Sequence, residues 1–127
     1  MGEELSGTNS ADFSYVAGTT ANVASITLQP GYYLLRGQGK ITMNTGSDYG
    51  TDVIISITSA SAAYDGNHLI RNLMPASGGS NIWMKIDRYV RVTTPTTYYL
   101  VMTYFSGGGT LRHINDSNSY LKAIRFN

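Results

Sequence analysis

Short runs of apolar and β-branched residues recur along the chain, and turn residues separate them at intervals of about 8 to 12 positions. The clearest alternation is at 52–59, where Val53, Ile55 and Ile57 lie on one face and the intervening residues lie on the other. No window has the period of an amphipathic helix, because Gly, Thr, Ser and β-branched residues interrupt every candidate. The pattern therefore predicts an all-β domain with about eight or nine strands. We expect these strands at 12–17, 23–29, 32–43, 52–59, 68–73, 81–94, 98–105, 110–114 and 120–126.

Two of these segments have irregular features. Gly37 and Gly39 predict a bend or bulge within 32–43, because strand positions without a side chain tolerate a break in pairing. Arg88 interrupts the apolar face of 81–94, and we expect a bulge or a strand break near it.

About eight antiparallel strands with a long central connection are typical of a β-sandwich with jelly-roll topology. An immunoglobulin-like sandwich fits less well, because its Cys…Trp…Cys spacing is absent, and an open barrel stays an alternative. The length of 127 residues fits a single domain. Residues 1–11 are mostly small and polar and predict a flexible tail or linker, so we place the sandwich domain at 12–127.

Composition argues against several classes of function. Nine Lys and Arg residues balance eight Asp and Glu residues and are dispersed, so we expect no nucleic-acid partner. Cysteine is absent, which removes disulfide frameworks, thiol catalysis and thiolate metal sites. The N-terminus lacks the basic and apolar regions of a signal peptide, and no run approaches the ~18 apolar residues of a membrane helix. We therefore expect no membrane insertion, whether the chain is complete or a fragment.

Catalytic and metal-binding patterns are also missing. The histidines, His68 and His113, accompany no Gly-x-Ser-x-Gly elbow and no zinc-type pair, so we expect no enzyme activity, cofactor or metal. The loop at 47–52 has two carboxylates able to ligate calcium, although a turn-capping role for Asp48 is the simpler interpretation. Nothing pairs two carboxylates across a cleft, as glycoside hydrolysis requires. The candidate carboxylates are Asp48, Asp52, Asp65, Asp87 and Asp116.

Ten tyrosines and one tryptophan are the most informative part of the composition. These side chains join a large apolar area to a polar tip and are enriched at protein interfaces, although tyrosine also packs well in ordinary strands. Neighbours such as Tyr32 and Tyr33 point to opposite faces, so one packs in the core and the other meets water or a partner. Trp83 lies opposite the core face, and 98–105 is apolar enough to be buried on both faces or at a subunit interface. For an oligomer interface we select Tyr99, Val101, Tyr104, Tyr120 and Phe126.

Two segments resemble a known family. The final strand, Ser119-Tyr120-Leu121-Lys122-Ala123-Ile124-Arg125-Phe126, is similar to that of C-terminal head domains of bacteriophage tail fibres and related virion surface proteins. The segment Ile26-Thr27-Leu28-Gln29-Pro30-Gly31-Tyr32-Tyr33-Leu34-Leu35 is similar to an early strand of those domains and of the trimeric jelly rolls related to tumour necrosis factor and C1q heads. The resemblance covers about 23–127. It implies a homotrimer built through apolar strands near a threefold axis, synthesis in the host cytoplasm and a place on the virion, with no catalytic motif.

The resemblance leads to the first functional hypothesis, a trimeric host-attachment head that binds a cell-surface component. A capsid decoration or structural virion protein with the same fold is the second hypothesis, and a carbohydrate-binding β-sandwich module is the third. We expect receptor contacts in loops rather than strands, and the candidate loops are 44–51, 64–68, 75–81 and 115–118. The candidate contact residues are Tyr49, Tyr64, Asn67, His68 and Asn81.

Overall fold

The computed structural model describes residues 3–16, 18–45, 52–73, 81–104 and 110–126, and within these ranges the regular structure is all strand. Accordingly, none of them forms a helix long and apolar enough to cross a bilayer. Every segment expected to be a strand contains one, and β1 and β2 are additional. The strands are β1 Glu4–Ser6, β2 Thr8–Asn9, β3 Phe13–Ser14, β4 Thr20–Leu28, β5 Gly31–Thr45, β6 Asp52–Thr58, β7 Leu69–Leu73, β8 Asn81–Val92, β9 Thr96–Tyr104, β10 Thr110–His113 and β11 Tyr120–Phe126.

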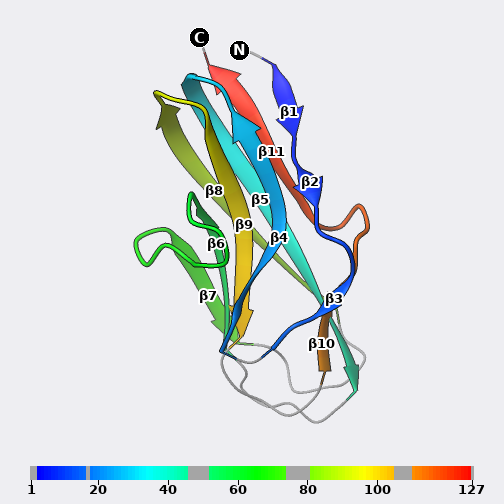
Figure 1. Cartoon of the computed structure of the whole chain (residues 1–127). Helices are drawn as coiled ribbons and strands as arrows, with labels where there is room; N and C mark the ends of the chain where they lie inside the picture. Colours follow the sequence, from blue (N-terminus) through cyan, green and yellow to red (C-terminus); the bar gives the residue numbers. More distant parts are fainter. Residues whose placement is uncertain (1–2, 17, 46–51, 74–80, 105–109, 127) are drawn as a thin grey trace.

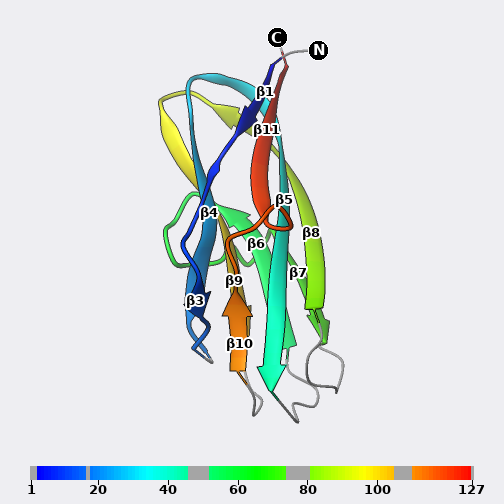
Figure 2. The same ribbon diagram turned by 90° about the vertical axis from the view of Figure 1, so that its right-hand side faces the viewer.

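The strands form two antiparallel sheets that pack face to face (Figures 1 and 2). In the first, called the β5 sheet, the order is β1-β11-β5-β8, and the short strands β10 and β3 extend it beside the far end of β5. In the second, called the β9 sheet, the order is β2-β4-β9-β6-β7. Without the short β2, β3 and β10, the orders are first-eighth-third-sixth and second-seventh-fourth-fifth, which is jelly-roll topology. The predicted β-sandwich is therefore confirmed, with eleven strands in the described residues rather than about eight.

The hydrophobic core lies between the two sheets, and strand alternation decides which residues enter it. In β5 the inward residues Tyr33, Leu35 and Ile41 are buried. Tyr33 is 1% exposed and its neighbour Tyr32 is 54% exposed, which confirms that the pair points to opposite faces. The Tyr33 hydroxyl donates a hydrogen bond to the carbonyl oxygen of Gln29 at 2.8 Å and so ties the core to the turn before β5.

Gly37 and Gly39 mark a close approach of the two sheets rather than a bulge. β5 keeps one register with β8 along the whole of their pairing. A Cβ atom on Gly37 would lie 2.7 Å from Cδ1 of Leu100, and one on Gly39 would collide with Sδ of Met102. The predicted bend was therefore wrong. Glycine is needed here because side chains of β9 already fill the space that a side chain on β5 would occupy.

The predicted strand break near Arg88 was also wrong. β8 is continuous from Asn81 to Val92, and the inward Arg88 side chain spans the space between the sheets. Its Nη1 donates hydrogen bonds to the carbonyl oxygen of Ile57 at 2.8 Å and to Oδ2 of Asp65 at 3.1 Å. A charged residue is tolerated on the core face because its guanidinium reaches acceptors at the edge of β6.

Residues 4–9 belong to the sandwich and are not a tail, contrary to our expectation for 1–11. β1 pairs with β11 of the β5 sheet, and β2 pairs with β4 of the β9 sheet. Gly7 lies where the chain crosses from one sheet to the other. Its N–H donates to the carbonyl oxygen of Leu121 at 2.7 Å, and a Cβ there would collide with the carbonyl oxygen of Ser25. Backbone hydrogen bonds hold this segment in the sheets. The mostly polar composition of the segment therefore did not indicate that it forms strands.

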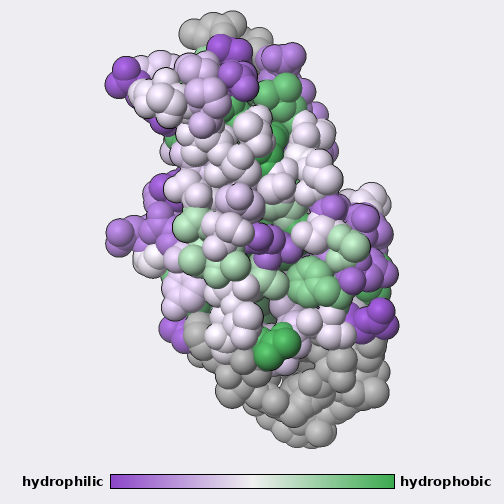
Figure 3. All heavy atoms as spheres, in the orientation of Figure 1, coloured by the Kyte–Doolittle hydropathy of each residue, from purple (hydrophilic) through white to green (hydrophobic). Residues whose placement is uncertain are grey.

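The connection between β6 and β7 (59–68) covers the outer face of the β9 sheet. The Ser56 hydroxyl of β6 bonds to two backbone groups of the connection, at 2.6 and 3.1 Å, and the Asn22 side chain of β4 bonds to two more of its residues. Val101 of β9 lies between Asn22 and Ser56 and is fully buried. Residues 100–104 of β9 are thus buried on both faces within one copy. Viewed from this side, the surface is mostly white and purple, with green residues in small separate groups (Figure 3).

Candidate functional site

The outer face of the β5 sheet exposes several large aromatic side chains together. In the register of this sheet, Tyr32 of β5 lies directly opposite Phe126 of β11 on one side and Arg91 of β8 on the other. Tyr89, two residues before Arg91 on β8, points to the same face. Tyr89 is 73% exposed, more than any other large hydrophobic side chain among the described residues. We call Tyr32, Tyr89, Arg91 and Phe126 the aromatic cluster.

The aromatic cluster forms a shallow, mainly apolar surface. The rings of Tyr89 and Phe126 stack with their centroids 6.1 Å apart and their planes at 26°. The Arg91 guanidinium lies over the Tyr32 ring, 5.6 Å from its centroid. Together these side chains line an open groove of about 710 Å³. Tyr and Arg are the residue types that concentrate at the centres of protein interfaces, so this surface is suited to burial against a partner.

The oligomer-interface residues selected from the sequence have different environments. Phe126 belongs to the aromatic cluster, and Tyr120 lies on the same face at the other end of β11. Tyr99 is half-buried on the outer face of the β9 sheet. Val101 and Tyr104 are only 0% and 7% exposed within one copy, so their selection was wrong. Val101 lies under the β6–β7 connection, and the core of one copy encloses Tyr104.

Tyr32 and Tyr89 are the interface candidates that the sequence pattern did not single out. Alternation already indicated that each has an inward-facing neighbour, Tyr33 and Val90 respectively. The missing information was the order of strands in the sheet. Only the neighbouring positions of β5, β8 and β11 bring these side chains into one cluster.

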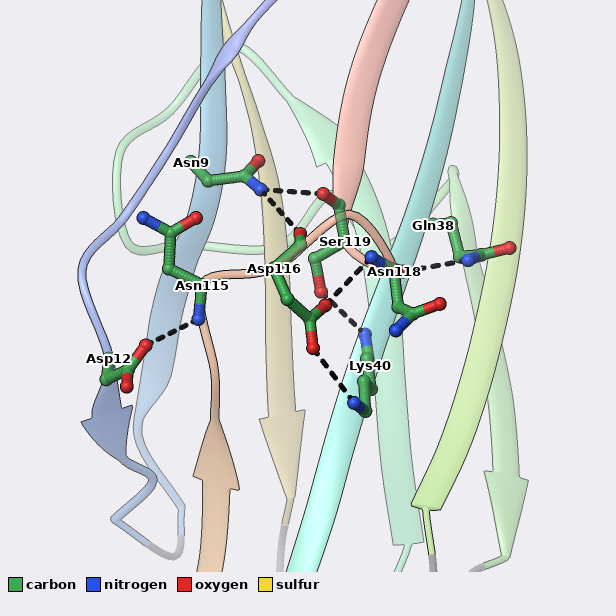
Figure 4. Close-up of polar contacts among 8 residues, drawn as sticks. All are labelled: Asn9, Asp12, Gln38, Lys40, Asn115, Asp116, Asn118 and Ser119. Atoms are coloured by element: carbon green, nitrogen blue, oxygen red, sulfur yellow. Dashed lines mark hydrogen bonds and ion pairs between the residues drawn. The ribbon is translucent and has the colours of Figure 1, made fainter.

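A second feature is the polar network around the connection between β10 and β11 (114–119), drawn in Figure 4. β11 and β10 pair with successive parts of one edge of β5, and the connection leaves the sheet between them. There the Ser119 hydroxyl accepts a hydrogen bond from the Lys40 N–H at 3.0 Å, which satisfies a backbone donor of β5. The Asn9 amide donates to the carbonyl oxygens of Ser119 at 2.6 Å and Asp116 at 3.3 Å. The network thus links the connection to both β5 and β2.

Asp116 fixes the shape of this connection through both carboxylate oxygens. Oδ2 lies 2.9 Å from Nζ of Lys40, and Oδ1 accepts the N–H of Asn118 at 2.8 Å. The Lys40 ammonium and then the Asn118 N–H hold the pKa of Asp116 below its usual value of 3.8. The Gln38 amide donates to the carbonyl oxygen of Asn118 at 2.7 Å. The carboxylate is therefore ionised near neutral pH, the Lys40 ammonium balances its charge, and these hydrogen bonds tie the connection to β5.

A pocket of about 430 Å³ lies between this connection and the segment from β1 to β2. Most of its side chains carry hydroxyl or amide groups, and one aromatic ring lies at its border. The Nζ atom of Lys122 is 4.9 Å from the centroid of that ring, which belongs to Tyr120. The side chains that the pocket offers include those of Thr8, Asn9, Asn115, Ser117, Tyr120 and Lys122.

The residues selected for receptor contact do not form one surface with this pocket. Tyr64, Asn67 and His68 are exposed on the β6–β7 connection, on the opposite side of the molecule from 114–119 in Figure 1. Asn81 is the first residue of β8, and its side chain lies outside the described part of the structure, as does the whole of Tyr49. Their role in receptor contact stays a prediction.

Asp65 and Asp87, two of the carboxylates considered for hydrolysis, take part in ion pairs. Asp65 lies 3.1 Å from Arg88, and Asp87 lies 3.5 Å from Arg36. The hydrogen bond from the N–H of Asn67 and the charge of Arg88 hold the pKa of Asp65 below its usual value of 3.8, although partial burial opposes them. A general acid needs a raised pKa, so Asp65 has the electrostatic environment of a structural ion pair.

Among the described residues, no group of three or more His, Cys, Asp or Glu side chains is placed to hold a metal ion. The loop at 47–52, for which calcium was considered, lies outside those residues except for Asp52 at the start of β6. The expected turn-capping role of Asp48 and the calcium alternative therefore both stay untested.

His113 ends β10, and its ring is buried against the N-terminal segment. Nε2 lies 3.2 Å from the carbonyl oxygen of Ser10, and the ring centroid lies 5.0 Å from that of Phe13. A neutral ring that donates from Nε2 to this carbonyl leaves Nδ1 without a partner among the described residues. Burial holds the pKa of His113 below its usual value of 6.5, against the opposing effects of the Ser10 carbonyl, Asp12 and Asp116.

We expect the free energy of unfolding to fall as the pH drops below 6.5, the usual pKa of the His113 side chain. The unfolded chain takes up the proton first, and the loss levels off below the lower pKa of the folded state. Urea unfolding between about pH 5 and pH 8 measures this slope. His113→Gln should flatten this slope. Equal slopes for the wild type and His113→Gln would contradict the assignment.

Comparison with known proteins adds no relative to this description: no family model matches the sequence, and no curated protein matches it. The fold and its exposed surfaces define a jelly-roll sandwich with an aromatic outer face on the β5 sheet and a polar pocket at its edge. These two surfaces are the candidate binding surfaces of the protein.

Proposed function

We propose that this protein is a bacteriophage virion surface domain that assembles as a homotrimer and serves as the host-attachment head of a tail fibre. The aromatic cluster on the outer face of the β5 sheet carries the proposal of assembly. The resemblance of 26–35 and 119–126 to tail-fibre head domains supports the place on the virion. The proposal assigns binding and assembly to the domain and no catalytic step.

The aromatic cluster favours assembly because of the amount of apolar surface it leaves in water. Tyr89 and Tyr32 are 73% and 54% exposed, although each belongs to a residue type that buries a large area when it packs. Removing these two rings from water contributes on the order of 4 kcal/mol per copy before the entropic costs of association. In a threefold assembly the same residues of the three copies meet at the axis, so the trimer requires the aromatic cluster to lie there.

A capsid decoration protein with the same trimeric fold is the competing function. Both functions use the aromatic cluster for assembly, but they differ in what the exposed loops bind. An attachment head binds a component of the host surface, whereas a decoration protein binds the capsid lattice. The choice between them therefore depends on the partner that the assembled trimer recognises.

Sedimentation equilibrium of the purified chain at micromolar concentrations tests assembly, and we expect three times the monomer mass of 13.8 kDa. Fluorescently labelled protein is then mixed with intact bacterial cells and, separately, with capsids stripped of their surface proteins. Retention on cells supports the attachment head, and retention on capsids alone replaces it with the decoration protein. A monomer at all concentrations would overturn the trimer, and binding to neither particle would overturn a role on the virion surface.

A further inference from the structure

The pocket beside the β10–β11 connection has the chemistry of a ligand site rather than of a subunit contact. We infer that this pocket binds a neutral saccharide, and that the saccharide is the host-surface component the domain recognises. The inference deepens the proposed attachment function and rests on it for its biological role. Saccharide binding itself is measurable whether or not that role holds.

The polar groups at the pocket match those of a sugar. Thr8, Asn115 and Ser117 are exposed and carry hydroxyl or amide groups. Each sugar hydroxyl can both donate and accept a hydrogen bond, and hydroxyl and amide side chains offer both functions in return. A volume of about 430 Å³ lies within the range that holds a small ligand.

Hydrogen bonds from side chains of other strands hold the backbone that forms one wall of the pocket. Asn9 holds the carbonyl groups of Asp116 and Ser119, and the Gln38 amide holds that of Asn118. Asn115 and Ser117 therefore project from a backbone that other residues fix, so binding need not order the loop. Preorganisation of this kind raises the affinity for a ligand that makes only hydrogen bonds and stacking contacts.

The charge balance at Asp116 and the ring of Tyr120 also suit a neutral sugar. Lys40 compensates the carboxylate of Asp116 at 2.9 Å, so the pocket offers no uncompensated carboxylate to attract a cation. The Tyr120 ring lies at the border, where the apolar C–H face of a pyranose can stack on it. The flexible Lys122 ammonium near that ring is a donor to a sugar hydroxyl. A neutral saccharide uses all three features.

The pocket and the aromatic cluster are far enough apart to be occupied together. Tyr120 pairs with Gln38 of β5, whereas Phe126 pairs with Tyr32, six residues further along the same strand. Six residues of an extended strand span about 20 Å. A second copy can therefore cover the cluster while the pocket stays open. We accordingly assign Tyr120 to the pocket and not to the subunit interface for which it was selected.

Nuclear magnetic resonance titration of the full chain with maltotriose, lactose and chitotriose tests the inference, with 3′-sialyllactose as the charged comparison. We expect at least one neutral sugar to bind with a Kd of about 1 mM and to shift the amide signals of 115–122. Asn115→Ala and Tyr120→Leu should each weaken binding by about tenfold or more. Asn67→Ala removes the same side chain from the β6–β7 connection and should change nothing. Circular dichroism and thermal midpoints confirm that each variant is folded.

Four outcomes would overturn the inference: no binding of any neutral sugar in the panel or on a glycan array, binding of the sialylated sugar alone, binding lost in Asn67→Ala, or binding unchanged in both pocket variants. Failure of the attachment function looks different. If the protein binds a sugar through Asn115 but attaches to no cell, the attachment function is contradicted and the saccharide site still holds. If the Asn115→Ala variant attaches to cells as well as the wild type does, the pocket is not the receptor site and the attachment function still holds.

Discussion

The Tyr89→Glu variant should be a monomer at concentrations at which the wild-type chain is a trimer. Tyr89 is the most exposed large hydrophobic residue among the described residues, and its ring stacks on Phe126 at the centre of the aromatic cluster. Loss of an interface tyrosine costs about 2 kcal/mol or more, and three copies of the substitution act in each trimer. The glutamate adds the cost of burying three carboxylates close together near the axis. The expected effect on the trimer dissociation constant is therefore at least about 10⁴-fold.

Trp83→Glu is the matched control for this prediction. Trp83 is 48% exposed on the same face of the β5 sheet, but it pairs with Lys40 at the other end of β8 and is not part of the aromatic cluster. Sedimentation equilibrium should find a trimer for Trp83→Glu and a folded monomer for Tyr89→Glu. If Tyr89→Glu stays trimeric, the subunit interface lies elsewhere. If only Trp83→Glu dissociates, the interface lies at the opposite end of the face.

The Gly39→Ala variant should lose about 1 to 3 kcal/mol of stability, which is a large share of the total for a domain of this size. Its Cβ would collide with Sδ of Met102, and because Met102 is fully buried, that side chain can shift only if its packed neighbours move as well. The collision predicts a coupled pair of positions. Met102→Ala alone should cost about 2 to 5 kcal/mol because it leaves a cavity. The double variant should cost less than the sum, because the new methyl group fills part of that cavity.

Urea unfolding of the two single variants and the double variant measures this coupling. Gly66→Ala is the control, because a Cβ atom there meets nothing within 4 Å. We expect that control to be neutral or slightly more stable than the wild type. If the losses of unfolding free energy in Gly39→Ala and Met102→Ala simply add in the double variant, the two positions are not in the close contact described here.

The described strands were largely predictable from the sequence because their signal is local. Alternation of apolar and polar residues predicted both ends of β11, and the turn at Pro30-Gly31 marked the boundary between β4 and β5. Most of the other longer strands begin and end within about three residues of their predicted ends. β1 and β2 were missed for the opposite reason. Their hydrogen bonds run to β11 and β4, and apart from Leu5, which packs against the core, their side chains are small or polar. Pairing through the backbone leaves no mark on composition.

The candidate surfaces were less predictable, since each depends on which strands are neighbours. For an oligomer interface the sequence selected Phe126, which belongs to the aromatic cluster, but it also selected Val101, which the β6–β7 connection covers. It placed the loop 115–118 among receptor candidates, but gave no sign that Asn9 and Lys40 hold that loop from far along the chain. A covering segment or a distant hydrogen bond cannot be read from periodicity, because periodicity reports only the two faces of one strand.

The sequence by itself determined an all-β chain, the positions of most strands and the face on which each side chain lies. These follow from the two-residue period of a strand, which any solvent-facing sheet imposes on composition. The tertiary structure alone decided that Gly37 and Gly39 are contact points between sheets, that Arg88 reaches the edge of β6, and that Tyr32, Tyr89 and Phe126 form one cluster. These are consequences of strand order and sheet packing, which bring together residues that no local pattern relates.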